Sequence, residues 1–273
     1  MTTDILFPPL TNFEPTRETL HWYAKALAVL PRVHAEAHPK WWHVAFEVQP
    51  DGLYTKSMAL PGGGSLQLKM DLDQHKVVML VDSRETAEFS MTGGMTATAF
   101  GDQLLAAAAS LGLTGEYERH RFENDEPRTY DPDTVPAFWQ SLVNANRIFA
   151  EFRATLSGEP GPVNFWAHGF DLAFEWFGTR MVAGGENVEY PSQINLGFYP
   201  GDPTGEPYFY SNPWPFEADQ LLGQPLPAGA SWHTEVWQGT ILLYDELAGE
   251  EQAEERLLEY AQTVHELASP ALR

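Results

Sequence analysis

The chain has 273 residues, of which 38 are acidic and 16 are basic, and its formal net charge at pH 7 is −22. Because it contains no cysteine, disulfides, thiolate nucleophiles and cysteine-ligated zinc or iron–sulfur sites are excluded. The excess of negative charge disfavours nucleic acid and anionic membrane surfaces as partners.

Hydrophobic periodicity predicts a helix, several antiparallel strands and a second helix in the first part of the chain. The helical pattern covers residues 17–35, where Pro31 is expected to kink the helix or end it early. Alternation predicts a strand over 42–49, followed by a turn signal at Pro50-Asp51-Gly52 and a return strand. Further patterns predict a hairpin of strands 66–72 and 77–81, an edge strand at 88–91, and an alanine-rich helix over 96–113.

The same order of elements follows a charged, proline-bearing segment. We therefore predict an α+β protein built by internal duplication, with two similar halves that are each an antiparallel sheet flanked by helices. The first half is residues 1–115, the connecting segment is 116–136, and the second half is 137–273. In the second half the patterns predict helices at 137–155 and 251–268, and between them strands within 163–177, at 193–199 and 208–211, and in a hairpin over 232–244.

The aromatic stretch NFWAHGFDLAFEWF begins at Asn164 and has two interpretations. The duplication aligns Asp51-Gly52-Leu53 with His168-Gly169-Phe170, which predicts a hairpin turn with positive φ at His168 and Gly169. The alternative is one long strand over 163–177 with His168 among the rings on one face. Such a strand would exceed the usual length of ~3–10 residues, so the turn is favoured.

Several short motifs occur in the order typical of one family. They are TLH at 19–21, WWHV at 41–44, PVNFWAHGFDLA at 162–173, GFYPG at 197–201 and FYS at 209–211. The chain resembles, over almost its whole length, an uncharacterised bacterial family catalogued as domain of unknown function five-nine-nine-six, which carries no known activity. The resemblance implies glutamine, lysine and arginine in many members where this chain has Lys25, Val29 and Pro31, and histidine in place of Asn164. If those polar residues form a family site, this chain has lost part of it.

Two histidine–carboxylate pairs are candidates for general acid/base catalysis, because an imidazole titrates near neutrality and a carboxylate fixes its tautomer. His43 and Glu47 are expected on the same side of the strand over 42–49, and His168 lies close to Asp171 in sequence. The alternative for His43 is a half-exposed strand residue without a catalytic role. The sequence does not decide whether the protein is an enzyme.

The sequence predicts no metal and no cofactor. His34 and His38 have the i, i+4 spacing of a helical zinc site, but histidines near a helix C-terminus are favoured by the helix dipole without any metal. Nucleotide-binding glycine motifs and a G-x-S-x-G nucleophile elbow are absent from the sequence.

The strongest compositional signal is a proline-rich loop with many rings, predicted near residues 198–216. Aromatic side chains on a loop are less easily explained as core than those on a strand. The candidate ligand-binding residues are Trp166, Tyr210, Trp214 and Phe216, which would form an aromatic-lined pocket in the second half. The alternative is that these rings only cover the sheet.

The leading functional hypothesis is therefore a binding protein for a small, partly apolar molecule. The alternatives are a hydrolase-like enzyme that uses a histidine–carboxylate pair, and a structural or protein-interaction module. The N-terminal residues MTTDILFPPL do not resemble a signal peptide, so a soluble, cytoplasmic protein is expected. The sequence does not predict the oligomeric state.

Overall fold

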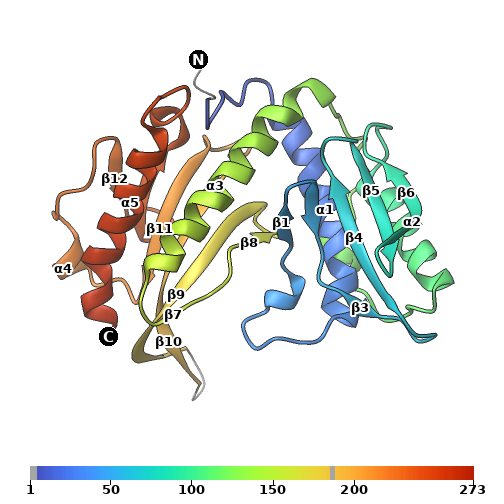
Figure 1. The fold of residues 1–273 in the computed structure, drawn as a ribbon, viewed down its shortest axis with the longest axis horizontal. Helices are drawn as coiled ribbons and strands as arrows, with labels where there is room; N and C mark the ends of the chain where they lie inside the picture. Colours follow the sequence, from blue (N-terminus) through green and yellow to red (C-terminus); the bar gives the residue numbers. More distant parts are fainter. Residues whose placement is uncertain (1–4, 185–187) are drawn as a thin grey trace. The chain divides into compact units, whose positions relative to one another are not determined.

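The protein was analysed as a computed structural model, which describes residues 5–184 and 188–273. It is an α+β fold with one six-stranded and one seven-stranded antiparallel sheet, both flanked by helices (Figure 1). The predicted fold class is confirmed. Described residues form two compact units: the N-unit comprises Leu10–Trp139 and Asn164–Asp171, and the C-unit comprises residues 5–9, Gln140–Val163 and Leu172–Arg273.

The N-unit contains the six-stranded sheet, in which strands β1, β2, β4, β5 and β6 follow one another and β3 pairs with β4. The turn predicted at Pro50-Asp51-Gly52 is present, because Gln49 of β1 pairs with Gly52 of β2 across Pro50 and Asp51. The elements are α1 (Glu14–His34), η1 (Trp42–Val44), β1 (Glu47–Gln49), β2 (Gly52–Tyr54), β3 (Met58–Ala59), β4 (Ser65–Asp71), β5 (Lys76–Val81), β6 (Arg84–Ser90), α2 (Ala97–Ser110), η2 (Arg119–Arg121), η3 (Pro132–Thr134) and β8 (Asn164–Trp166).

Helices α1 and α2 pack through a stacked pair of rings. The centroids of Tyr23 and Phe100 are 3.9 Å apart, both rings are fully buried, and the Tyr23 hydroxyl donates to the carbonyl of Met95 at 2.7 Å. Helix α2 begins where Thr96 caps it, with Oγ1 accepting from the Ala99 amide at 3.1 Å. Pro31 does not end α1 early, because the helix continues to His34.

The strand predicted over 42–49 is wrong in its first part. Trp41 adopts a left-handed conformation with φ of 60°, and Trp42–Val44 form a 3₁₀ turn before the short strand β1. A left-handed residue reverses the local chain direction, so the alternating pattern of hydrophobic residues here does not reflect strand geometry.

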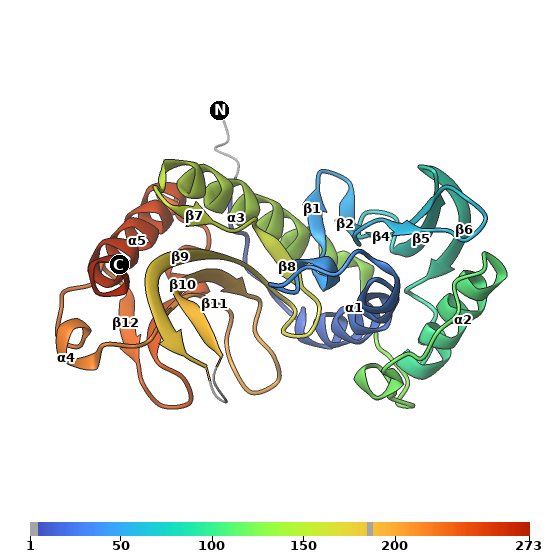
Figure 2. The same cartoon turned by 90° about the horizontal axis from the view of Figure 1, so that it is seen from below.

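The C-unit contains the seven-stranded sheet, whose path is β12-β13-β11-β10-β9-β7. Helices α3 and α5 lie on one face of this sheet (Figure 2). The elements are α3 (Val135–Thr155, which begins in the N-unit residues), β7 (Glu159–Pro160), β9 (Asp171–Ala183), β10 (Glu189–Tyr199), β11 (Tyr208–Trp214), α4 (Ala218–Leu221), β12 (Ala230–His233), β13 (Gly239–Leu243), η4 (Tyr244–Glu246), α5 (Ala253–Ala268) and η5 (Ser269–Leu272).

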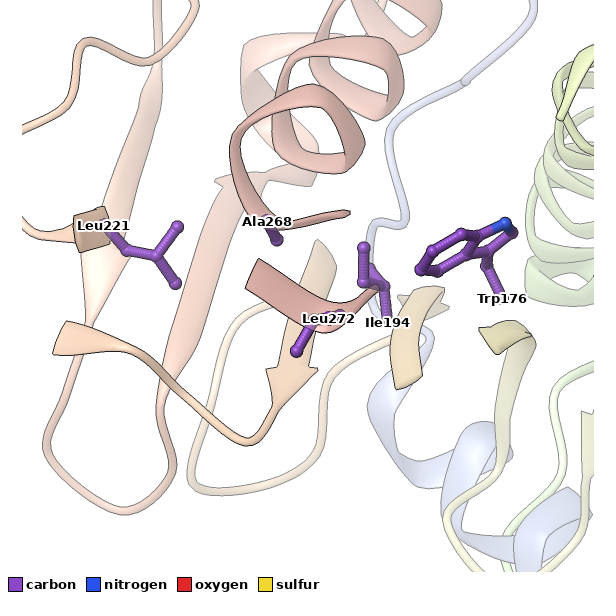
Figure 3. Packing of buried hydrophobic residues seen from close by; sticks show 5 residues of the cluster. All are labelled: Trp176, Ile194, Leu221, Ala268 and Leu272. Atoms are coloured by element: carbon purple, nitrogen blue, oxygen red, sulfur yellow. The ribbon is translucent and has the colours of Figure 1, made fainter. Parts of the chain in front are cut away.

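One cluster of buried residues joins the sheet of the C-unit to its last helices. Trp176 of β9 is 3% exposed, and its indole Nε1 donates to the Ser157 carbonyl just after α3 at 2.7 Å. The ring therefore fixes the end of α3 to the sheet. The cluster consists of Trp176, Ile194, Leu221, Ala268 and Leu272 (Figure 3).

The aromatic stretch forms a turn, as predicted. Strand β8 ends at Trp166, residues 167–170 turn, and β9 begins at Asp171. The predicted backbone is wrong in detail, because the positive φ of 55° belongs to Phe170 and not to His168 or Gly169. The Phe170 ring is fully buried against the rings of Phe138 and Phe165 at 5.6 and 5.0 Å, so packing stabilises a conformation that a bulky residue rarely adopts.

Phe46 and Phe165 form an antiparallel bridge with N–O distances of 2.8 and 2.9 Å. The internal duplication itself stays a prediction. No helix of the described segments is long and apolar enough to cross a membrane.

Candidate functional site

A cavity of about 270 Å³ lies in the N-unit and has several cationic residues in its wall. Three elements and one turn contribute to it. We call it the basic cavity, and its lining residues are Lys25, Ala28, Arg32, Val44, His120, Arg121, Ala167 and His168.

Helix geometry places the first group of lining residues. Lys25, Ala28 and Arg32 are at positions i, i+3 and i+7 of α1, so they lie on one helix face. Val44 comes from η1, and Arg121 from η2. Ala167 and His168 belong to the turn after β8, so the aromatic stretch places part of the wall.

Two guanidinium groups of the basic cavity share one carboxylate. Glu118 Oε2 accepts from Nε of Arg121, and it lies 3.6 Å from Nε of Arg32. Burial lowers the pKa of Arg32, and the charge of Arg121 lowers it further, while Glu118 partly opposes them. The pair therefore carries more positive charge than its acidic partner offsets.

Lys25 adds a third cation to the wall. Of the described residues, none places a carboxylate within 4.0 Å of its Nζ, which lies 4.3 Å from the centroid of the Trp22 ring. Burial lowers the pKa of Lys25 most, Glu18 raises it and Arg17 lowers it. In a chain of net charge −22, this concentration of positive charge is the main electrostatic feature of the site.

His21 supports the turn that carries His168. Its Nδ1 is 3.2 Å from the guanidinium of Arg17, which only donates, and its Nε2 is 3.0 Å from the carbonyl of His168, which only accepts. These partners require the neutral tautomer with the proton on Nε2. Burial, followed by the charges of Lys25 and Arg17, lowers the pKa of His21 to about 3.

The predicted catalytic residues do not form the expected first pair. His43 is buried in η1 and its Nδ1 accepts from the amide of His38 at 3.2 Å, whereas Glu47 in β1 forms an ion pair with Lys56. The prediction that His43 and Glu47 share one face of a strand is wrong, because His43 lies in a 3₁₀ turn that precedes β1. Burial, then Arg32 and His38, lowers the pKa of His43.

Of the second predicted pair, His168 lines the basic cavity and Asp171 begins β9. His34 and His38 do not lie on one helix, as a helical zinc site would require, because α1 ends at His34. His34 Nε2 is instead 2.8 Å from the Tyr117 hydroxyl. Among residues 5–184 and 188–273, no group of three or more histidine, aspartate or glutamate side chains is arranged to hold a metal ion.

The predicted aromatic residues lie elsewhere, and none of them lines the basic cavity. Tyr210 and Trp214 belong to β11, because the strand predicted at 208–211 is present and continues to Trp214, where a loop was predicted. Its alternate residues, including Phe209, are buried. Phe216 follows that strand and packs 6.1 Å from the Trp232 ring. Trp166 ends β8 with its ring 5.8 Å from that of His168.

None of the three cations of the basic cavity is among the site residues predicted from the sequence, although Lys25 stands at one of the positions that the family resemblance singles out. Lys25 and Arg32 carry a usable signal, because they share one face of a predicted helix in a chain with only 16 basic residues. Arg121 carries none, since it lies in the charged segment without periodicity that resembles a simple linker.

The fold thus defines an α+β protein with two antiparallel sheets and a basic cavity in one unit. The chain belongs to the family of unknown function DUF5996, whose model matches residues 7–272. This match confirms the family resemblance expected from the short motifs. No curated protein and no solved structure matches the chain.

Proposed function

We propose that the protein binds a small organic anion in the basic cavity. The single observation that carries this proposal is the group of Lys25, Arg32 and Arg121 around one cavity, where the only carboxylate that pairs with any of them within 4.0 Å, in the described part of the chain, is Glu118. Groups of like charge repel each other in a partly buried site, and a bound anion relieves that repulsion.

The lining also indicates the chemistry of the ligand. Guanidinium groups bind carboxylate or phosphate groups through two parallel hydrogen bonds, which gives both strength and orientation. Ala28, Val44 and Ala167 supply apolar wall beside them. The best fit is an anionic head with a short apolar body. A nucleic acid is disfavoured by the net charge of −22.

The test is calorimetric titration with sodium butyrate and inorganic phosphate, with butan-1-ol as the uncharged control. Arg121→Met should weaken the binding of the anions about tenfold or more, which corresponds to ~1.4 kcal/mol. The matched control is Arg119→Met in the same short helix, because Arg119 pairs with Asp102 and Glu123 and does not line the cavity. Equal binding by both variants, or by butanol and butyrate, would contradict the proposal.

The hydrolase hypothesis is favoured by one observation, which is that His168 lines the same cavity. A histidine that acts as general base must lie beside the bound substrate. The assay is hydrolysis of p-nitrophenyl butyrate by the wild-type protein and by His168→Ala. Turnover that disappears in the variant supports an enzyme, and equal rates contradict it.

The aromatic residues of the second half remain an alternative place for the ligand. Trp214→Ala should then reduce butyrate binding while Arg121→Met leaves it unchanged. If neither variant matters because no probe binds, the structural or protein-interaction hypothesis replaces both.

A further inference from the structure

The C-unit contains a second cavity whose charge has the opposite sign. It lies between α3 and α5 and has a volume of about 630 Å³, within the usual ~300–1,000 Å³ of small-molecule sites. We call it the α3–α5 cavity. Its apolar wall comes from Phe152, Leu156 and Leu258.

The two charged residues that line this cavity are both acidic. Glu151 accepts a hydrogen bond from Arg147 at 3.0 Å, but the same guanidinium also binds Glu254 at 2.9 and 2.6 Å, so it serves two carboxylates. Glu266 accepts from the uncharged amide of Gln262 at 2.7 Å. The lining therefore has more negative charge than its partners offset.

His265 completes the wall without adding a cation. Burial lowers its pKa most, Arg273 lowers it further and Glu266 opposes them, so the ring is neutral at pH 7. The ring meets Trp176 edge to face with centroids 4.9 Å apart. Its Nε2 is buried and makes no hydrogen bond with any residue that the structure describes.

We propose that the α3–α5 cavity binds a small organic ammonium ion. The charged head lies at the carboxylates of Glu151 and Glu266, and the alkyl part lies against the ring of Phe152. This inference is independent of the anion proposed for the basic cavity, because it concerns other residues in the other unit and a ligand of opposite charge.

The experiment uses three probes of equal chain length, which are n-butylammonium, butan-1-ol and butyrate. Binding is followed by the indole N–H resonance of Trp176 in two-dimensional NMR, because this group donates to the carbonyl of Ser157 in the cavity wall. The signal is assigned by its loss in Trp176→Phe. Butylammonium should shift this resonance with a millimolar dissociation constant, as expected for so few atoms, and butanol and butyrate should leave it in place.

Glu266→Gln should weaken the binding of butylammonium at least fivefold, because it removes the charge and keeps the shape. The matched control is Glu259→Gln, which removes an exposed carboxylate from the same helix outside the cavity and should bind like the wild type. Glu151→Gln repeats the test from α3 if the first variant does not fold. Equal shifts by the three probes, or equal affinities of the Glu266 and Glu259 variants, would overturn the proposal.

Discussion

The two cavities have helix-lined walls in common but differ in charge. In the basic cavity, α1 presents Lys25 and Arg32 from one face, whereas in the α3–α5 cavity the helices present Glu151 and Glu266. The net charge of −22 describes the chain as a whole and agrees with only one of these sites. Composition therefore indicates the average charge of a protein surface. The charge of a site depends on the few side chains that line it.

The two sites also differ in what supports them. The α3–α5 cavity adjoins a buried cluster around Trp176, and the basic cavity includes an irregular turn held by His21 and Phe170. We therefore expect substitutions in the cluster around Trp176 to lower stability most. Substitution of His21, which supports the turn, should change how stability depends on pH.

The largest expected effect is that of Trp176→Ala in the C-unit. The variant loses a ring that is 3% exposed and its hydrogen bond to Ser157, so the free energy of unfolding should fall by ~3–5 kcal/mol. Urea denaturation measures it. The control is Trp41→Ala in the N-unit, where the ring is 54% exposed and a loss below ~1 kcal/mol is expected. Similar losses for both would show that the cluster does not anchor α3.

The second effect is the pH dependence conferred by His21. Its pKa in the folded protein is about 3, below the 6.5 of the unfolded chain, because burial disfavours the imidazolium. Between these values only the unfolded state takes up a proton, so stability is complete above pH 6.5 and falls as the pH drops toward 3. The contribution lost should be roughly 2–4 kcal/mol, since a partly exposed ring keeps some hydration.

Urea denaturation at pH 7, 5 and 4 should therefore show a shallower pH dependence for His21→Gln than for the wild type. His265→Gln in the C-unit provides the comparison, because burial lowers that pKa as well and the change has the same sign. An unchanged pH profile in His21→Gln would mean that folding does not lower the pKa of His21.

The third effect concerns the turn of the basic cavity. A Cβ added at Gly169 would lie 2.4 Å from Oδ1 of Asp171, so the carboxylate must rotate away and Gly169→Ala should cost up to ~1 kcal/mol of unfolding free energy. Gly62→Ala is the control, because its Cβ would meet no atom within 4 Å.

His168→Asn, in the same turn, should leave the melting temperature within a few degrees, as expected for a turn residue. A large loss there would identify His168 as a structural group.

The smallest effect is that of Lys25→Met without ligand. The pKa of Lys25 is lowered, so its charged form costs stability at neutral pH and this cost disappears only as the pH rises toward 10.5. The variant should melt at the same or a slightly higher temperature. Lys76→Met should change stability in the opposite direction, because Glu88 raises the pKa of Lys76. A clear drop in melting temperature for Lys25→Met would contradict the surplus of positive charge.

Much of the fold was predictable because its signals are local. The hairpin at Asp51-Gly52, the alanine-rich helix predicted from residue 96 and the turn near His168 each depend on a few adjacent residues. The prediction of a strand at His43 is wrong because Trp41, just before it, adopts a left-handed conformation. The alternation of hydrophobic residues does not reveal such a conformation. The loop predicted after the strand at 208–211 is wrong for a related reason, because β11 continues through Pro213 to Trp214.

By itself, the sequence determined the fold class, the family and the order of the elements, since these depend on hydrophobic periodicity and short motifs that act over a few residues. Only the tertiary structure decided where the charges meet. Lys25, Arg121 and His168 are separated by long stretches of chain, and they share a wall because packing brings α1, η2 and the turn after β8 together. Periodicity cannot show this, because it reports which residues are buried and not which buried or half-buried groups become neighbours.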